Sequence, residues 1–264
     1  MTEPITYTDD VDEPIDNGAL PLGERRADDV RDAAFLMEAS VSLPDLAELP
    51  AYKYYGIHDS NDGDPRYTDA PLNQMYAHAR DNPTIKDPLG NGHCVGYSMK
   101  HLLLCYPIVN IAPTLSGSDI YHLAQEADEW PGNNYQGTSV RAGLKALKSL
   151  GFIDTYVWTS QAETVAQWLL SGRGPVCIGT DWMTGMDKPS KSNGYTIKPT
   201  GNKRGGHAWI LNGVNQQTKR FRLLNSWGTW GLNGRAYIGW DDLQTLMSQR
   251  SNAAASPLEI RKTT

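Results

Sequence analysis

Residues 221–237 read FRLLNSWGTWGLNGRAY, and this stretch decides the expected fold. A β-type run ends at Asn225, two Trp-Gly pairs follow, and a second β-type run, RAYIGW, occupies residues 235–240. Short β-rich runs separated by Gly and Asn turns are typical of antiparallel strands. The preceding run, HAWILNGVN, begins at His207 and is also a short β-rich segment. We therefore expect a hairpin that brings Asn225, 18 residues later (225 − 207), close to His207.

The first half of the chain has a different periodicity. CVGYSMKHLLLCY, residues 94–106, places apolar side chains at helical spacing after the glycine-rich GNGH, which predicts a buried helix entered from a turn. Further helices are expected at 118–129, 138–150 and 161–171. In the second of these, Thr138 or Ser139 can cap the start and Gly151 ends the helix. Helices followed by antiparallel strands predict an α+β fold with two lobes and a cleft between them.

The 264 residues suffice for such a domain, and 39% apolar with 20% charged residues is a globular composition. Residues 1–24 are acidic and lack an apolar period, so we expect a flexible tail. Residues 25–250 are the predicted domain, made of an N-terminal strap and loops (25–92), a helical lobe (93–172) and a β-rich lobe (173–250). Residues 251–264 are expected to form a C-terminal tail.

Cys94 is the candidate nucleophile. It stands where the turn meets the predicted helix, and the partial positive charge of a helix N-terminus favours a thiolate. A free cysteine is also commonly a small buried hydrophobe, and that is the interpretation for Cys105 and Cys177, which lie within apolar segments. Three cysteines at irregular spacing are no disulfide framework.

His207 is the candidate base. It opens an apolar β run after two glycines, so its ring can face a cleft. A thiol nucleophile needs such a base, and a third group that fixes the base's tautomer and plane. The amide oxygen of Asn225 can serve as that group, and the Trp227 ring can cover the hydrogen bond between the two.

The three boxes HCVGYS (93–98), GGHAWILNGV (205–214) and NSWGTWGLNGRAYI (225–238) resemble, in this order, the Cys, His and Asn boxes of papain-like cysteine peptidases. YQGTSVRAGLKALKSLG (135–151) is similar to the family's segment that pairs with substrate backbone. VRDAAF (30–35) resembles the strap ahead of the domain in bacterial and phage-type members. The resemblance implies a helical lobe with Cys94, a β-rich lobe with His207 and Asn225, and cleavage of a peptide bound between them.

The resemblance also implies secondary site residues. Gly137, and with it Gly206, would bind substrate backbone. A glutamine six residues before the nucleophile usually helps to hold the oxyanion, but this chain has Pro88 there, and Asn91 is the nearest side-chain amide that could replace it. Val95 stands where a Trp or Tyr is usual, and the Cys–His interval is 113 residues (207 − 94) rather than about 130–150.

Other kinds of site are weighed against this reading. Cys94, His101 and Cys105 share one helical stripe, but the two cysteines would lie roughly 16 Å apart along the axis, too far for ligands that sit about 2.0–2.3 Å from one zinc ion. No G-x-S-x-G occurs, which disfavours a serine hydrolase. Two alternatives stay open: a papain-like fold kept as a weakly active or inactive binding module, and an amidase acting on non-protein peptide bonds.

Charge and hydropathy limit the partners. The formal charge of −6, without a long basic run, gives no footprint for nucleic acid. No window is apolar enough to span a membrane, and the N-terminus carries no signal-peptide pattern. We expect a cytoplasmic peptidase, with association with a virion as the alternative. Its partner is a peptide or protein substrate, and it needs no cofactor or metal.

Overall fold

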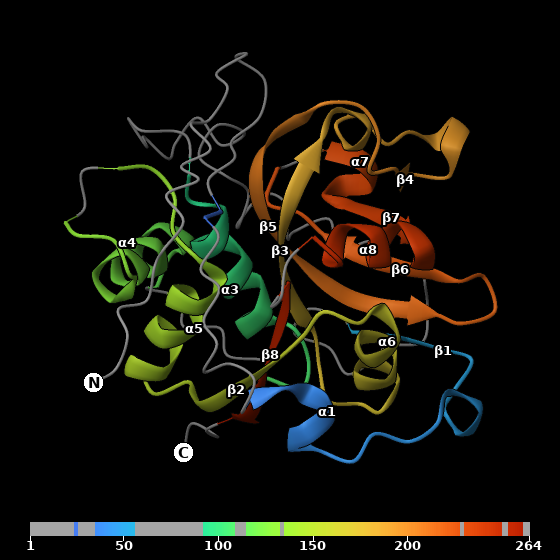
Figure 1. Ribbon diagram of the computed structural model, residues 1–264, viewed down its shortest axis with the longest axis horizontal. Helices are drawn as coiled ribbons and strands as arrows, with labels where there is room; N and C mark the ends of the chain where they lie inside the picture. Colours follow the sequence, from blue (N-terminus) through green and yellow to red (C-terminus); the bar gives the residue numbers. More distant parts are fainter. Residues whose placement is uncertain are drawn as a thin grey trace.

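The computed structural model describes residues 24–25, 35–55, 92–108, 115–132, 135–227, 230–249 and 253–260. Helices α3, α4 and α5 gather on one side of a large sheet, and α6, α7 and α8 lie on the other side (Figure 1). The α-helices are α1 (Met37–Ser40), α3 (Cys94–Leu104), α4 (Gly117–Ala127), α5 (Val140–Ser149), α6 (Ala162–Leu170), α7 (Trp230–Asn233) and α8 (Trp240–Met247). Short 3-10 turns are η2 (Leu46–Glu48), η3 (Thr184–Met186) and η4 (Lys191–Asn193).

Eight strands form one sheet in the order β2-β8-β3-β5-β6-β7-β4, with β1 also paired to β5. All the pairs are antiparallel except β4 with β7. The strands are β1 (Tyr52–Tyr54), β2 (Ile153–Thr159), β3 (Val176–Met183), β4 (Thr196–Ile197), β5 (Lys203–Asn215), β6 (Arg220–Leu224), β7 (Arg235–Gly239) and β8 (Ala254–Ile260). The α+β prediction is confirmed.

The predicted helices are present, with ends within a few residues of those expected. Ser139 caps α5, its hydroxyl accepting from the Ala142 N–H at 3.1 Å. Gly151 follows with a φ of +78°, a left-handed conformation that glycine adopts without strain. The helix at 117–127 begins with a capping box in which Ser116 and Asp119 satisfy each other's backbone N–H groups.

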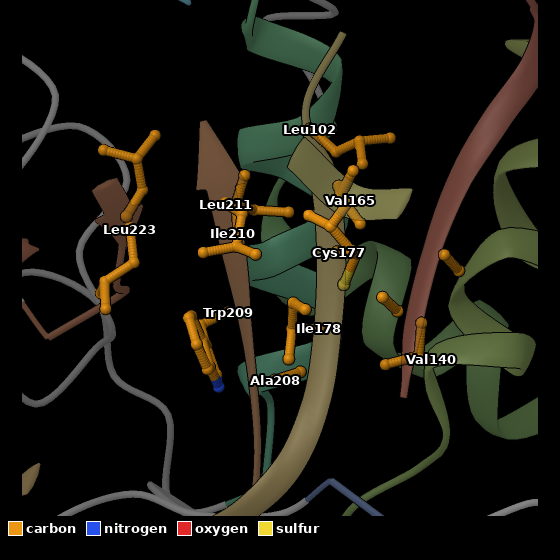
Figure 2. Packing of buried hydrophobic residues seen from close by; sticks show 14 of the residues in the cluster. Leu102, Val140, Val165, Cys177, Ile178, Ala208, Trp209, Ile210, Leu211 and Leu223 are labelled. Atoms are coloured by element: carbon orange, nitrogen blue, oxygen red, sulfur yellow. The ribbon is translucent and has the colours of Figure 1, made fainter. Parts of the chain in front are cut away.

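The core lies between the helices and the central strands. Figure 2 shows Cys177 and Ile178 of β3 beside Ala208 and Ile210 of β5, and these strands pair along most of their length. Helix α3, which carries Leu102, packs against both strands. Burial of an apolar side chain is worth about 1.5–3 kcal/mol. This packing therefore holds α3 against β3 and β5.

The C-terminal residues differ from their predicted role as a tail. Residues 254–260 form β8, which lies between β2 and β3 inside the sheet. Ala253, Ala254 and Ala255 are fully buried. A short run of alanines has weak β propensity and carries no alternating pattern, so its place in the sheet comes from partners far away in the sequence.

The structure describes only part of the expected N-terminal tail, strap and loops. Tyr52–Tyr54, within the expected N-terminal strap and loops (25–92), form β1 on β5. Residues 56–91 of the same region lie outside the described residues, as do tail residues 1–23 and residues 30–34 of the strap-like segment. In the part of the chain that the structure describes, no helix combines the length and the apolar character needed to cross a membrane.

Candidate active site

His207 and Asn225 are joined by a hydrogen bond. Nε2 of His207 lies 2.9 Å from Oδ1 of Asn225, and both residues are buried. The strands explain the contact: β5 and β6 pair from Ile210 with Leu224 onward, so the two residues lie just beyond the paired end. The Asn225 oxygen also accepts from the Ser226 N–H at 2.8 Å. An oxygen held in this way accepts from the imidazole, which fixes Nε2 as a protonated donor.

Two indole rings enclose the imidazole. Trp227 stacks on His207 with ring centroids 4.4 Å apart and planes 26° apart. Trp182 of β3 meets the same ring edge-on, at 4.9 Å and 84°. The first contact was predicted from the sequence. The second was missed, because Trp182 lies in a β-type run with no motif, and only the β3–β5 pairing brings it to His207.

Cys94 is the first residue of α3, and its thiol reaches the strand that carries His207. The thiol accepts hydrogen bonds from the backbone N–H groups of Ala208 and Val95. Ala208 directly follows His207 in β5. Gly92, two residues before the thiol, has a φ of +100°, and an added Cβ there would lie 2.7 Å from the Gly137 nitrogen. The glycine thus permits the tight turn into the helix.

The ionisation of Cys94 differs from the expectation. The thiol is only 1% exposed, and burial raises its pKa to about 12, with the Glu24 carboxylate as a further cause. Hydrogen bonds from backbone N–H groups, led by that of Ala208, oppose this rise. Desolvation therefore outweighs the favourable helix terminus. In this arrangement the thiol is protonated at neutral pH.

Glu24 and Arg25 connect the helical side to the sheet at this point. The Glu24 N–H donates to the Gly206 carbonyl at 3.1 Å, and the Arg25 N–H donates to the Thr138 carbonyl at 2.9 Å. Gly206 belongs to β5, and Thr138 lies two residues before the start of α5. Glu24, the last residue of the predicted flexible tail, is 7% exposed. The sequence gives no local signal for this contact, because two residues carry no periodicity.

The remaining predicted site residues have different outcomes. The Gly206 carbonyl is engaged by Glu24, as just described, whereas the Gly137 N–H donates to the Tyr121 hydroxyl at 3.1 Å. Asn91 and Pro88 lie outside the described residues. Cys105 and Cys177 are fully buried thiols, and burial raises the pKa of Cys177 well above its usual value. Within the described ranges, no three His, Cys, Asp or Glu side chains gather as metal ligands would.

Comparison with solved structures gives the same architecture. Xylellain, a cysteine protease from Xylella fastidiosa, superimposes with a TM-score of 0.60 over 91% of this chain and 96% of its own, at 17% identity. The chain has the papain-like cysteine protease fold. The Amb a 11 cysteine protease of ragweed pollen, in its proform, gives a TM-score of 0.51 at 13% identity, covering 90% of this chain and 65% of that one.

Comparisons of the sequence with family models and with curated proteins do not detect the papain-like fold. No protein-family model matches the chain, and no curated protein is significantly similar to it. The likeness to these solved structures is therefore one of fold.

Proposed function

We infer that this chain is a cysteine-type peptidase in which Cys94 is the nucleophile, His207 the base and acid, and Asn225 the residue that orients the imidazole. The observation that carries the inference is the 2.9 Å hydrogen bond between His207 Nε2 and Asn225. This hydrogen bond engages Nε2 and leaves Nδ1 as the ring nitrogen that exchanges a proton with the thiol. The Cys94 thiol bonds to the backbone N–H of the residue next to this histidine.

The reaction proceeds through an acyl-enzyme. His207 Nδ1 takes the thiol proton, and the sulfur of Cys94 attacks the carbonyl carbon of the peptide bond. The oxyanion that forms accepts from backbone N–H groups at the start of α3, with Asn91 as the proposed side-chain donor. The C–N bond breaks as the imidazolium gives its proton to the leaving amine. Water, deprotonated by His207, then hydrolyses the thioester and restores the thiol.

Because the pKa of Cys94 is raised, we infer that the thiol becomes a nucleophile only after a structural rearrangement. Burial and the Glu24 carboxylate are the causes that raise the pKa, and Glu24 is bonded to the residue before His207. Displacement of Glu24 and Arg25 removes the negative charge beside the sulfur and vacates the carbonyls of Gly206 and Thr138. An extended peptide can then pair with the same two carbonyls.

The test compares the chain with its Cys94→Ala and Cys94→Ser variants on a panel of fluorogenic peptides. We expect Cys94→Ala to lower kcat/KM by on the order of 10³-fold or more, as removal of a nucleophile does. Cys105→Ala is the matched control and should keep the activity, because Cys105 is a fully buried thiol at the far end of α3. Equal hydrolysis by Cys94→Ala and the unaltered chain would rule the assignment out.

Labelling with a thiol-directed peptide epoxide separates this function from the two open alternatives. A peptidase becomes modified at Cys94, as mapped by mass spectrometry, and loses its activity in proportion. A binding module takes up no label at that residue. An amidase is labelled but cleaves acylated non-protein amides in preference to the peptide panel.

A further inference from the structure

Arg25 presents its guanidinium to two aromatic rings of the loop between α4 and α5. Its Cζ lies 4.1 Å from the ring centroid of Trp130 and 4.7 Å from that of Tyr135. The two rings lie 6.3 Å apart with their planes at 68°. A cation within about 6 Å of a ring centroid is attracted by the negative face of the ring. Trp130 and Tyr135 together, called the aromatic clamp below, thus hold a positive side chain from two directions.

The aromatic clamp is fixed by one carboxylate. Asp128 Oδ1 accepts from the Tyr135 hydroxyl at 2.7 Å and from the Trp130 N–H at 3.1 Å. The other oxygen, Oδ2, accepts from the Thr138 hydroxyl at 2.7 Å. Thr138 is the residue whose carbonyl receives the Arg25 N–H. One side chain therefore positions both rings and the backbone acceptor beside them.

The contacts of residues 24 and 25 are those that an extended peptide would make. Each residue donates one backbone hydrogen bond, one to the sheet at Gly206 and one to the helical side at Thr138. Gly206 directly precedes His207, so these bonds run past the candidate catalytic residues. Any residue in an extended conformation could make the backbone bond of residue 25. The Arg25 side chain adds a specific contact, because it enters the aromatic clamp. The clamp is pre-organised, which lowers the cost of ordering a ligand.

We propose that the aromatic clamp is a subsite for the arginine or lysine side chain of an extended peptide substrate, and that Arg25 is its internal occupant. This inference rests on the proposed peptidase function, because it places the clamp beside the peptide that Cys94 attacks. Arginine is the preferred residue, since its planar guanidinium stacks on aromatic faces more favourably than an ammonium group does.

The binding test uses the full chain with Cys94→Ala, which prevents turnover, and Arg25→Ala, which empties the clamp. Capped pentapeptides that carry arginine are titrated by calorimetry against the same peptides with citrulline, a neutral isostere that lacks the cation. A cation–π contact corresponds to about a 2- to 30-fold gain in affinity. We expect the arginine peptide to bind tighter by a factor in this range, and the lysine peptide to fall between the two.

Substitution of the rings locates the effect. Trp130→Leu should abolish the difference between arginine and citrulline, and Tyr135→Leu should do the same if Trp130→Leu fails to fold by circular dichroism. Trp240→Leu is the matched control: it removes another cation–π pair whose ring is half-buried, with Lys219 Nζ 4.4 Å from the Trp240 ring, and should leave the arginine preference unchanged. Loss of preference in the control as well would overturn the assignment to the aromatic clamp.

The outcomes separate the subsite from the catalytic proposal. Equal Kd values for arginine and citrulline peptides, or no binding of either at about 1 mM, overturn the subsite, whereas Cys94-dependent hydrolysis of other peptides would still support the peptidase. Arginine preference in the Cys94→Ala protein, combined with no hydrolysis by the Cys94 form, supports the subsite and overturns the peptidase.

Discussion

Asn225 accepts a hydrogen bond from His207 at 2.9 Å, and the same oxygen accepts from the backbone of Ser226. The imidazole plane is therefore set by an oxygen that is itself fixed. Asn225→Ala should lower kcat/KM by about 10²-fold, because a mispositioned base forfeits part of the gain from proton transfer. Asn225→Asp keeps an acceptor and should recover most of the activity. Steady-state kinetics of both variants checks this, and identical losses would contradict the orienting role.

The carboxylate of Glu24 opposes the ionisation of the Cys94 thiol. The pKa of Cys94 is raised from 9.0 to about 12, chiefly by burial and also by this negative charge. Glu24→Gln removes the charge, so the pKa should fall and the thiolate fraction at pH 8 should rise, about tenfold for each unit of decrease. The rate of Cys94 alkylation by iodoacetamide between pH 7 and 11 measures the shift. A pH profile unchanged by the substitution would show that the carboxylate does not act on the thiol.

Gly206 leaves room for the backbone of Glu24. A Cβ added at Gly206 would lie 2.0 Å from the Glu24 carbonyl oxygen, and the backbone there is outside the left-handed region. Gly206→Ala should therefore expel residues 24 and 25 without straining β5. Limited proteolysis of the N-terminal segment and alkylation of Cys94 should both become faster.

A matched control for Gly206→Ala is Gly239→Ala, where the nearest neighbour of the new Cβ is the end of the Asp242 side chain at 2.9 Å. That side chain can move, so proteolysis and alkylation should stay as in the unaltered chain. The same rates in Gly206→Ala and Gly239→Ala would mean that the Glu24 backbone does not occupy this position in solution.

Strand β8 holds β2 and β3 together. It pairs with β2 along Ile153–Thr159 and with β3 at Cys177 and Ile178. A chain that ends at Asn252 leaves those backbone groups without partners, and buried unpaired groups cost about 1–3 kcal/mol each. We expect it not to fold cooperatively in urea titrations followed by circular dichroism. A chain that ends at Ile260 keeps β8 and should fold, and cooperative folding of the shorter chain would contradict an essential role for the strand.

The sequence predicts the elements whose signals are local. The helix that begins at Cys94 has a glycine turn and an apolar stripe, and the hairpin of His207 and Asn225 has two β-type runs at hairpin spacing. Features that depend on distant partners were missed. Strand β8 was not predicted, because its alanine-rich start has no strand pattern. The contact of Trp182 with His207 was not predicted either, because only the pairing of β3 with β5 creates it. The raised pKa of Cys94 could not be foreseen either, because it depends on burial and on Glu24, neither of which a motif reports.

The place of β8 in the sheet has a consequence for synthesis on the ribosome. β2 ends at Thr159 and β8 begins at Ala254, so 95 residues (254 − 159) must be added before β2 meets its neighbour. At about 5–20 residues per second this takes roughly 5–20 s. During that interval the nascent chain carries strand edges that other molecules could join. Chaperone occupancy should therefore peak just before β8 emerges.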